Sequence, residues 1–398
     1  MNRKNFYQTL PFFAGIIVLA TLIATIQCLL LPLKTFTDGG GHYTEYNNYV
    51  IFKYSFFHLI HHKDLYQLYP LEQWDLFKYS PTFALIMGPL AILPDWAGLF
   101  LWNLVNSMIL FFAIWKLPFK NNNSRIYAIL FILIELVTSL QNTQSNALIA
   151  GLVILAFLAM EKKQLSLAAL LIVCTVFIKI FGLVAISMFL LYNDKIKVGL
   201  YFIGWFLLLG LLPLVVISPD LLIFLYKSWG TLLHNDQVTS YGLSVMGWLY
   251  TWFHLDLNKS LVVLLGAMLF CVPFINYKFF KEIKFRVYFL SSILLWIIIF
   301  NHRAESPTFI IAAAGIAIWY FYQEKKLINT LLVIFAFIFT ILSATDIFPT
   351  IVKRQFLEPY VMKAVPCILI WFKISWDLIF YKREDASRET NMSSIIEL

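Results

Sequence analysis

Acidic side chains that could act as a general base lie shortly after the first long apolar run of the chain. Asp38 precedes a run of glycines, and Glu45 comes soon after it. A carboxylate just outside a membrane can take the proton of an attacking hydroxyl group. The same residues also suit a solvated loop whose glycines supply the turns. Asp38 and Glu45 are therefore candidate catalytic bases, with an ordinary loop as the alternative.

Amide and cationic side chains occur where the chain passes between apolar runs. Gln144 and Asn146 lie in the polar segment 141–146, and amide groups suit sugar and phosphate oxygens. Lys179 interrupts the apolar stretch 165–192, where it could bind a phosphate. The alternatives are an ordinary turn at 141–146 and a lysine whose ammonium group snorkels to the membrane surface.

The segment 301–307 is the densest polar cluster between two apolar runs, and it contains His302, Arg303 and Glu305. Its cations could meet a phosphate beside a carboxylate, because charge-assisted hydrogen bonds to phosphate are strong. An ion pair between Arg303 and Glu305 that only closes the loop is the alternative. All three residues are candidate substrate-binding groups.

Histidines with metal-like spacing occur twice, but neither group predicts a metal site. His302 and Glu305 lack an evident third ligand, whereas zinc sites use several protein ligands. His58, His61 and His62 lie on a segment that we expect to rest in the membrane interface. We therefore expect no metal and no other cofactor.

Long apolar runs must position these residues. The chain of 398 residues is 61% hydrophobic and only 13% charged, against roughly 25% charged residues in soluble proteins. Runs such as 12–31 and 198–217 match the ~20 residues that cross a bilayer. We predict one all-α transmembrane domain over 1–398, with about 10–13 helices. The expected spans are 12–32, 82–93, 97–115, 126–140, 147–160, 165–178, 180–192, 198–217, 260–276, 286–300, 307–322, 327–344 and 361–380.

Lysine and arginine clusters predict the orientation in the membrane, because cytoplasmic loops carry an excess of both residues. The long connections 33–81 and 218–259 then lie on the extracytoplasmic face, together with all seven histidines. This arrangement requires 82–93 to be re-entrant or half-spanning, and 165–192 to form a hairpin or not to cross. The net charge of +8 indicates contact with membrane lipids rather than nucleic acid. We expect a multi-pass protein of the cell membrane.

Both long connections contain amphipathic segments. In 45–62 the apolar residues share one helical face and polar residues such as Asn47, Ser55 and His58 recur on the other. The segment 218–255 similarly interleaves aromatic and polar residues. Both predict helices that lie at the level of the lipid headgroups, where an amphiphilic substrate would also lie.

The sequence lacks the motifs of nucleotide-dependent and hydrolytic enzymes. It has no Walker loop, no dinucleotide fingerprint, no GxSxG and no HExxH. No soluble domain is large enough to hold a nucleotide sugar. Any transferase chemistry therefore needs a substrate that carries its own activation in the membrane, as polyprenyl-phosphate sugars do.

Short motifs recur along the chain in a fixed order. They include 48–52 (Asn-Tyr-x-x-Phe), 65–66 (Leu-Tyr), 77–81 (Phe-Lys-Tyr-Ser-Pro) and 89–94 (Pro-Leu-Ala-Ile-Leu-Pro). In order and spacing the chain resembles the polyprenyl-phosphate-dependent membrane glycosyltransferases of the GT-C superfamily. Within them it is most similar to glycosyltransferase family 87, a mannosyltransferase-like group. The resemblance covers about 12–320 and implies a GT-C-like helix bundle.

The resemblance also implies roles for individual residues. Gln144, Asn146, Lys179 and His302 match elements of the family, and Tyr79 lies in the matching start of the second apolar segment. These residues would bind the donor, with the cations near its phosphate.

The family's catalytic aspartate falls on Asn48, which cannot act as a base. Asn48 and the neighbouring Tyr49 are therefore candidate substrate-binding residues. The base would be Glu45, because Glu-Tyr-x-x-Tyr repeats the family pattern slightly earlier, or Asp38.

The expected function is an inverting transfer of a mannose-like hexose from a polyprenyl-phosphate sugar to a glycan or glycolipid acceptor on the extracytoplasmic face. A transporter or flippase of lipid-linked saccharides is one alternative, and Lys179 within a broken segment fits it. A catalytically inactive GT-C-like protein is the other, because of Asn48.

Overall fold

Helices dominate the structure, a computed structural model that describes residues 9–35, 41–235 and 241–382. The chain is 74% helical. In the described residues the strands are β1 (Lys34–Thr35) and β2 (His42–Tyr43), which pair antiparallel. A helix satisfies its backbone hydrogen bonds within one segment, which a chain in lipid requires. The predicted all-α polytopic membrane architecture is confirmed.

The helices differ widely in length, and short 3₁₀ or π turns, labelled η, interrupt or extend several of them. In chain order they are α2 (Leu10–Leu30), α3 (Asn47–Ile60), α4 (Pro81–Ile86), α5 (Gly88–Ala91), α6 (Asp95–Trp115), α7 (Asn122–Gln141), α8 (Asn146–Glu161), α9 (Leu165–Ile178), η1 (Ile180–Leu191), α10 (Lys195–Leu211), η2 (Leu212–Val215), α11 (Pro219–Asn235), α12 (Val245–Phe253), α13 (Lys259–Cys271), η3 (Val272–Phe279), α14 (Ile283–Ile299), η4 (Ser306–Thr308), α15 (Phe309–Tyr322), α16 (Leu327–Ala336), η5 (Phe337–Ile341), η6 (Leu342–Ala344), α17 (Thr350–Val352), η7 (Lys353–Leu357) and α18 (Val365–Ile379).

Within the described residues, six helical segments are long and apolar enough to cross a membrane, by length and composition. They are Leu10–Leu30, Asp95–Trp115, Asn122–Gln141, Lys195–Val215, Lys259–Phe279 and Leu327–Ala344. Shorter apolar helices accompany them, at Asn146–Glu161, Leu165–Ile178, Ile180–Leu191 and Ser306–Tyr322. The six long and four shorter segments together reach the lower end of the predicted 10–13 membrane helices.

The predicted span 82–93 is wrong as a continuous crossing. Ser80 caps the first helix there, because its Oγ accepts a hydrogen bond from the Phe83 N–H at 3.1 Å. The helix α4 ends at Ile86, and Pro89 lies in the first turn of the separate helix α5. Two pieces of this length cover about half of a ~30 Å bilayer core. They pack against α3 and α6, which matches the half-spanning alternative.

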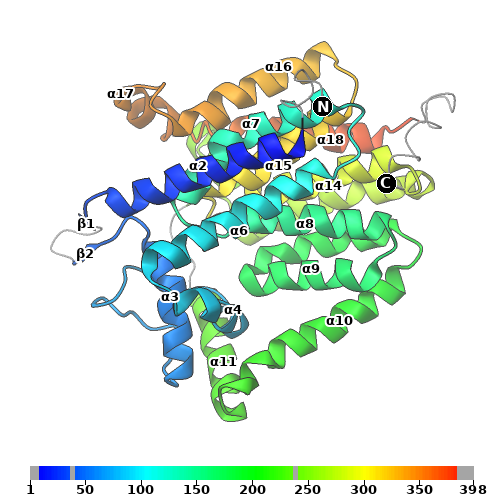
Figure 1. Cartoon of the computed structure of the whole chain (residues 1–398). Coiled ribbons are helices and arrows are strands. Elements are labelled where there is room, and N and C mark those ends of the chain that lie inside the picture. Colours follow the sequence, from blue (N-terminus) through cyan, green and yellow to red (C-terminus); the bar gives the residue numbers. More distant parts are fainter. Residues whose placement is uncertain (1–8, 36–40, 236–240, 383–398) are drawn as a thin grey trace.

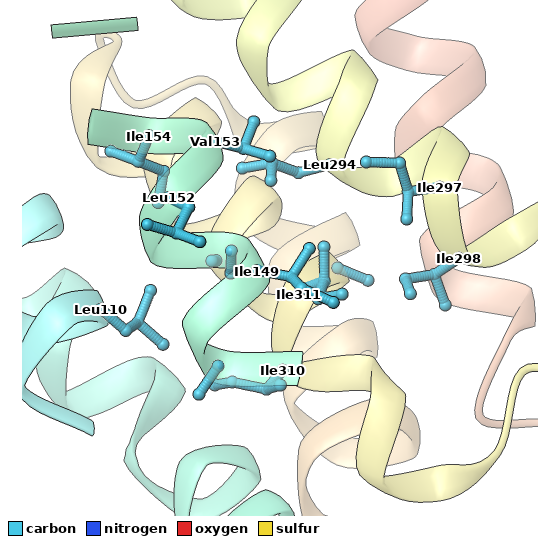
Figure 2. Packing of buried hydrophobic residues seen from close by; sticks show 14 of the residues in the cluster. Leu110, Ile149, Leu152, Val153, Ile154, Leu294, Ile297, Ile298, Ile310 and Ile311 are labelled. Carbon is cyan, nitrogen blue, oxygen red and sulfur yellow. The ribbon is translucent and has the colours of Figure 1, made fainter. Parts of the chain in front are cut away.

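The centre of the bundle is aliphatic. Figure 2 shows Ile149 and Val153 of α8 facing Ile311 of α15 and Leu294 of α14, while Leu152 lies on the side of Leu110 of α6. Gly151 allows α8 to approach α6 closely, because a Cβ atom there would lie 2.8 Å from the backbone nitrogen of Leu110. This packing fixes α8, and with it the polar residues where α8 begins.

Polar connections gather at the two ends of the bundle. In Figure 1, α3 and α11 lie across the direction of α2, α6, α8 and α9 at one end. At this end the connections before α4, before α8, after α9 and before α15 are joined by hydrogen bonds. At the other end, Arg286 forms two hydrogen bonds of 2.6 and 2.7 Å with the carboxylate of Glu161. We call the first end the network end.

The helix α3 lies at the network end, but its polar face is not solvated. Asn47, Ser55 and His58 are buried, and each has a hydrogen-bonded partner. The Asn47 side chain bonds the backbone of Trp74, and His58 Nε2 lies 2.6 Å from the Glu72 carboxylate. The prediction that Asn47 and His58 lie on a solvated face is therefore wrong, because the connection 61–80 folds over this part of the helix, whereas His61 at its end is exposed.

Candidate functional site

Lys179 lies at the break between α9 and η1. Its backbone is extended (φ −144°, ψ 124°), so the helix stops there and a second one begins. The ammonium group donates a hydrogen bond to Asn146 Oδ1 at 2.8 Å. It also lies 5.9 Å from the ring centre of Tyr79 and 5.6 Å from that of Phe181. Lys179 is thus anchored inside the bundle end and does not snorkel along its surface.

Asn146 connects this lysine to two other segments. It is fully buried at the start of α8, and its Nδ2 donates to Gln144 Oε1 at 2.6 Å and to the Pro307 carbonyl at 3.1 Å. Gln144 Nε2 in turn donates to Glu305 Oε2 at 3.3 Å. The four side chains Lys179, Asn146, Gln144 and Glu305 form a continuous chain of hydrogen bonds. We call it the Lys179 network.

Exposure increases along the Lys179 network from Asn146 through Gln144 to Glu305. Asn146 is buried, Gln144 and Lys179 are half-buried, and Glu305 is exposed. A polar path therefore leads from the bundle interior to the surface of the network end. A phosphate or sugar hydroxyl that enters along this path would meet an ammonium group and amides in a setting where water screens charge poorly.

Tyr79 lies beside the Lys179 network and is held by contacts of its own carbonyl and ring and by a hydrogen bond of the next residue. Its carbonyl accepts a hydrogen bond from the Tyr66 hydroxyl at 2.9 Å, and its ring stacks on Phe83 at 4.9 Å. The following Ser80 donates to the Phe177 carbonyl at 2.6 Å, two residues before Lys179. Burial raises the pKa of Tyr79 above its ordinary value, so its hydroxyl keeps its proton.

The loop 301–305 supplies a second cation. Burial lowers the pKa of Arg303, and the carboxylates of Asp75 and Glu305 act in the opposite direction, so both lie near the guanidinium group. Arginine nevertheless remains charged. Two connections far apart in the sequence, 61–80 and 301–307, therefore present acidic and basic groups to one another.

His302 differs from its expected role as a cation. Burial and then the charge of Lys259 lower its pKa below the ordinary value, so the imidazole is neutral at neutral pH. Gly242 approaches the same loop, since a Cβ atom there would lie 2.4 Å from the His302 carbonyl oxygen. The Leu243 N–H donates to the Ala304 carbonyl at 2.9 Å. The second long connection is thus attached to 301–305.

Glu45, Asn48 and Tyr49 bond to groups other than the four side chains of the Lys179 network. Glu45 pairs with Lys34 at 2.5 Å and is 18% exposed, and Asp38 lies outside the described residues. Asn48 Nδ2 donates to the Asn142 carbonyl at 2.9 Å, next to the segment that contains Gln144. Tyr49 is fully buried and its hydroxyl donates to the Leu90 carbonyl, so it is a packing residue in this structure.

A buried ion pair near the network escaped the sequence analysis. Lys363 Nζ lies 2.7 Å from Glu135 Oε1 and 2.8 Å from Ser306 Oγ. The side chains of Lys363 and Glu135 are 6% and 0% exposed. Ser306 lies between Glu305 and Pro307, which both bond to the Lys179 network. A lone glutamate inside the predicted span 126–140 and a lone lysine near the start of 361–380 were the available signals.

The chain is similar to one known protein family over most of its length. The family model of glycosyltransferase family 87 matches residues 77–344. The match includes Tyr79, the whole Lys179 network and the loop 301–305, whereas Glu45 and Lys363 lie outside it. No curated protein matches the chain.

Proposed function

The chain belongs to glycosyltransferase family 87, and from this premise we propose that it moves a mannose-like hexose from a polyprenyl-phosphate donor to an acceptor hydroxyl, with inversion. The acceptor would be a glycan or glycolipid, and the reaction would occur at the network end, on the extracytoplasmic face. The family indicates a membrane glycosyltransferase. The donor, the sugar and the face are our proposal.

The observation that carries the proposal is the anchored ammonium group of Lys179 at a break inside an apolar stretch. In this reaction the bond between the sugar and the lipid phosphate breaks, and negative charge grows on the phosphate oxygen. A cation held in place before the reaction stabilises that charge without reorganisation. Arg303, on the facing loop, would supply a second positive charge.

The remaining network residues would orient the donor. Gln144 and Asn146 offer amide groups, and the neutral Tyr79 hydroxyl can donate a hydrogen bond to a sugar or phosphate oxygen. Glu305, at the exposed end of the network, would accept hydrogen bonds from sugar hydroxyls. The neutral His302 would act as a hydrogen-bonding group and not as a cation.

The base that removes the acceptor proton would be Glu45, or Asp38 in the segment that precedes it. Glu45 lies near the network end and is partly accessible. The competing base is Glu305, because the structure joins this carboxylate to Gln144 and to the charge of Lys179. If Asn48 reflects a lost function, none of these carboxylates would support transfer.

The position of the polar groups also bears on the transporter alternative. The Lys179 network lies at one end, and the centre of the bundle is aliphatic (Figure 2). A transporter needs a polar path near the midplane of the bilayer. This arrangement supports the transferase.

The test is a transfer assay with the purified protein, labelled polyprenyl-phosphate mannose and a membrane glycolipid extract. Lys179→Gln should reduce transfer on the order of 10²-fold, because loss of one preorganised charge costs this much in comparable sites. Lys227→Gln is the matched control, since Lys227 is exposed on α11 at the same end and has no ion pair among the described residues. Wild-type transfer by Lys179→Gln would refute the phosphate-binding role.

The base is identified by three further variants. Glu45→Gln should lower kcat by roughly 10²–10⁴-fold with little change in KM, as loss of a general base does. Glu305→Gln should mainly raise KM, and Asp38→Asn serves as the third comparison. A large loss of kcat only in Glu305→Gln would transfer the role to Glu305, and full activity in all three would rule out each carboxylate as the base.

A further inference from the structure

A groove opens between α9 and α10 at the end of the bundle opposite the Lys179 network. Its volume is about 570 Å³, within the ~300–1,000 Å³ range of ligand sites. Polar groups line its mouth, namely Lys163, Gln164, Ser166 and Lys197, and leucines of α9 line its wall. The groove lies at the opposite end of α9 from Lys179 and has no part in that reaction.

One face of α10 forms one side of the groove. Lys197, Tyr201 and Trp205 follow at intervals of four residues, so they lie above one another on the same helical face. Successive members are ~6 Å apart along the axis. This order, from a cation through a phenol to an indole, matches the change from charged headgroups to acyl chains in a bilayer.

The other side is held rigidly by the turn between α8 and α9. Lys163 has a φ of 56°, a left-handed conformation that is uncommon for a residue with a side chain. The turn keeps it there, because the N–H groups of Lys163 and Gln164 donate to the carbonyls of Met160 and Ala159 at 3.0 and 2.8 Å. The Trp205 indole also donates to Ser166 Oγ at 3.1 Å, which ties α10 to the start of α9.

The two lysines of the groove are exposed cations. Among the residues that the structure describes, neither Lys163 nor Lys197 has an ion pair or a side-chain hydrogen bond, and both are exposed. The groove continues past Leu167, which is 44% exposed, toward the surface that would face lipid chains. Only 11% of the apolar stretch within Lys195–Val215 is buried, so little protein covers this side of α10.

We propose that this groove binds the headgroup of an anionic phospholipid, with its phosphodiester between Lys163 and Lys197 and its acyl chains along the leucines of α9. A phosphate needs cationic donors, and acyl chains need an adjoining apolar wall. The groove provides both side by side, as basic pockets between membrane helices do. This inference is independent of the proposed transferase activity.

The experiment measures lipid binding to the detergent-solubilised full-length protein by native mass spectrometry and by thermal unfolding. The probe is dioleoyl-phosphatidylglycerol, and dioleoyl-phosphatidylcholine is the neutral comparison. The wild type should retain phosphatidylglycerol selectively and unfold at a higher temperature in its presence. The double variant Lys163→Gln/Lys197→Gln should bind it on the order of tenfold more weakly, because each basic residue adds to the attraction.

The matched control is Lys162→Gln/Lys195→Gln. Lys162 lies in the same turn as Lys163, and Lys195 lies in the first turn of α10 together with Lys197. Both carry the same charge as the groove lysines, but they do not line the groove. This control should bind like the wild type, and Lys163→Arg/Lys197→Arg should also retain binding. Equal weakening of both Gln pairs, or of neither, would overturn the proposal. So would equal stabilisation by soluble glycerol phosphate.

Discussion

Lys179 is held by a neutral amide, and no carboxylate in the described residues forms an ion pair with it. An ion pair would offset its charge, whereas the Asn146 oxygen orients the ammonium group and leaves most of that charge available. The nearest acidic influence comes from Glu305, at the exposed end of the network. This arrangement suits a site that receives an anion from a substrate.

At the residue scale, His302 should make stability depend on pH. Its pKa in the folded protein is below the ~6.5 of an exposed histidine, so the unfolded chain binds a proton first as the pH falls. Its contribution is therefore present above about pH 6.5 and is lost as the pH falls from there through the folded pKa. His302→Gln should reduce the loss of thermal stability between pH 7.5 and 5.5, measured by unfolding in detergent.

The comparison for His302 is His61→Gln, because His61 is exposed at the end of α3. This variant should keep the wild-type dependence on pH. If both variants behave like the wild type, His302 does not contribute to the acid sensitivity.

At the element scale, the contact between α6 and α8 places Asn146 and therefore the network. Gly151→Ala should destabilise this contact, because the new methyl group would lie 2.8 Å from the backbone of Leu110. Overpacking of this kind costs about 1–3 kcal/mol. The expected result is a lower unfolding temperature in detergent, together with weaker transfer.

Gly204→Ala on α10 is the control for Gly151→Ala, since no atom lies within 4 Å of a Cβ atom there. It should leave the unfolding temperature unchanged or raise it slightly, because alanine favours a helix over glycine. Equal stability of both variants would show that α8 can shift without cost.

At the scale of the whole molecule, the ion pair of Lys363 and Glu135 joins the start of α15 to α7 and to the segment before α18. Lys363→Met should cost about 3–5 kcal/mol, because it leaves a buried carboxylate without its partner. The double variant Lys363→Met/Glu135→Leu should recover much of this loss. A double-mutant cycle of unfolding free energies measures the difference.

The transfer assay extends that test to the site. In the double variant Ser306 loses its bond to Lys363, so KM for the lipid donor should rise even where stability has recovered. An unchanged KM would mean that Lys363 supports the fold without positioning the loop 301–307.

Several properties followed from the sequence because they depend on local composition. The length and apolarity of segments such as 12–32 and 97–115 predicted α2 and α6, since a chain in lipid must bond its own backbone. Polar residues confined to short connections likewise indicated Gln144, Asn146, Lys179 and 301–307 as candidates, and the structure joins them at one end of the bundle. The family membership rests on the same region.

Other properties depended on helix packing. The burial of Asn47 and His58 on α3 and the pairing of Lys363 with Glu135 have no signal within one segment, because each involves a second segment. The pattern of apolar and polar residues in one helix shows which residues share a face. It does not show which way that face points or which segment packs against it.

The sequence by itself therefore determined that this is a helical membrane protein with its polar groups in a few connections. Only the tertiary structure decided which of those groups meet. Asn146 and Lys179 are far apart along the chain, and the packing of α8 against α9 brings them to hydrogen-bonding distance. Hydrophobicity is a property of each segment, whereas a hydrogen bond between segments requires both to be placed within a few tenths of an ångström.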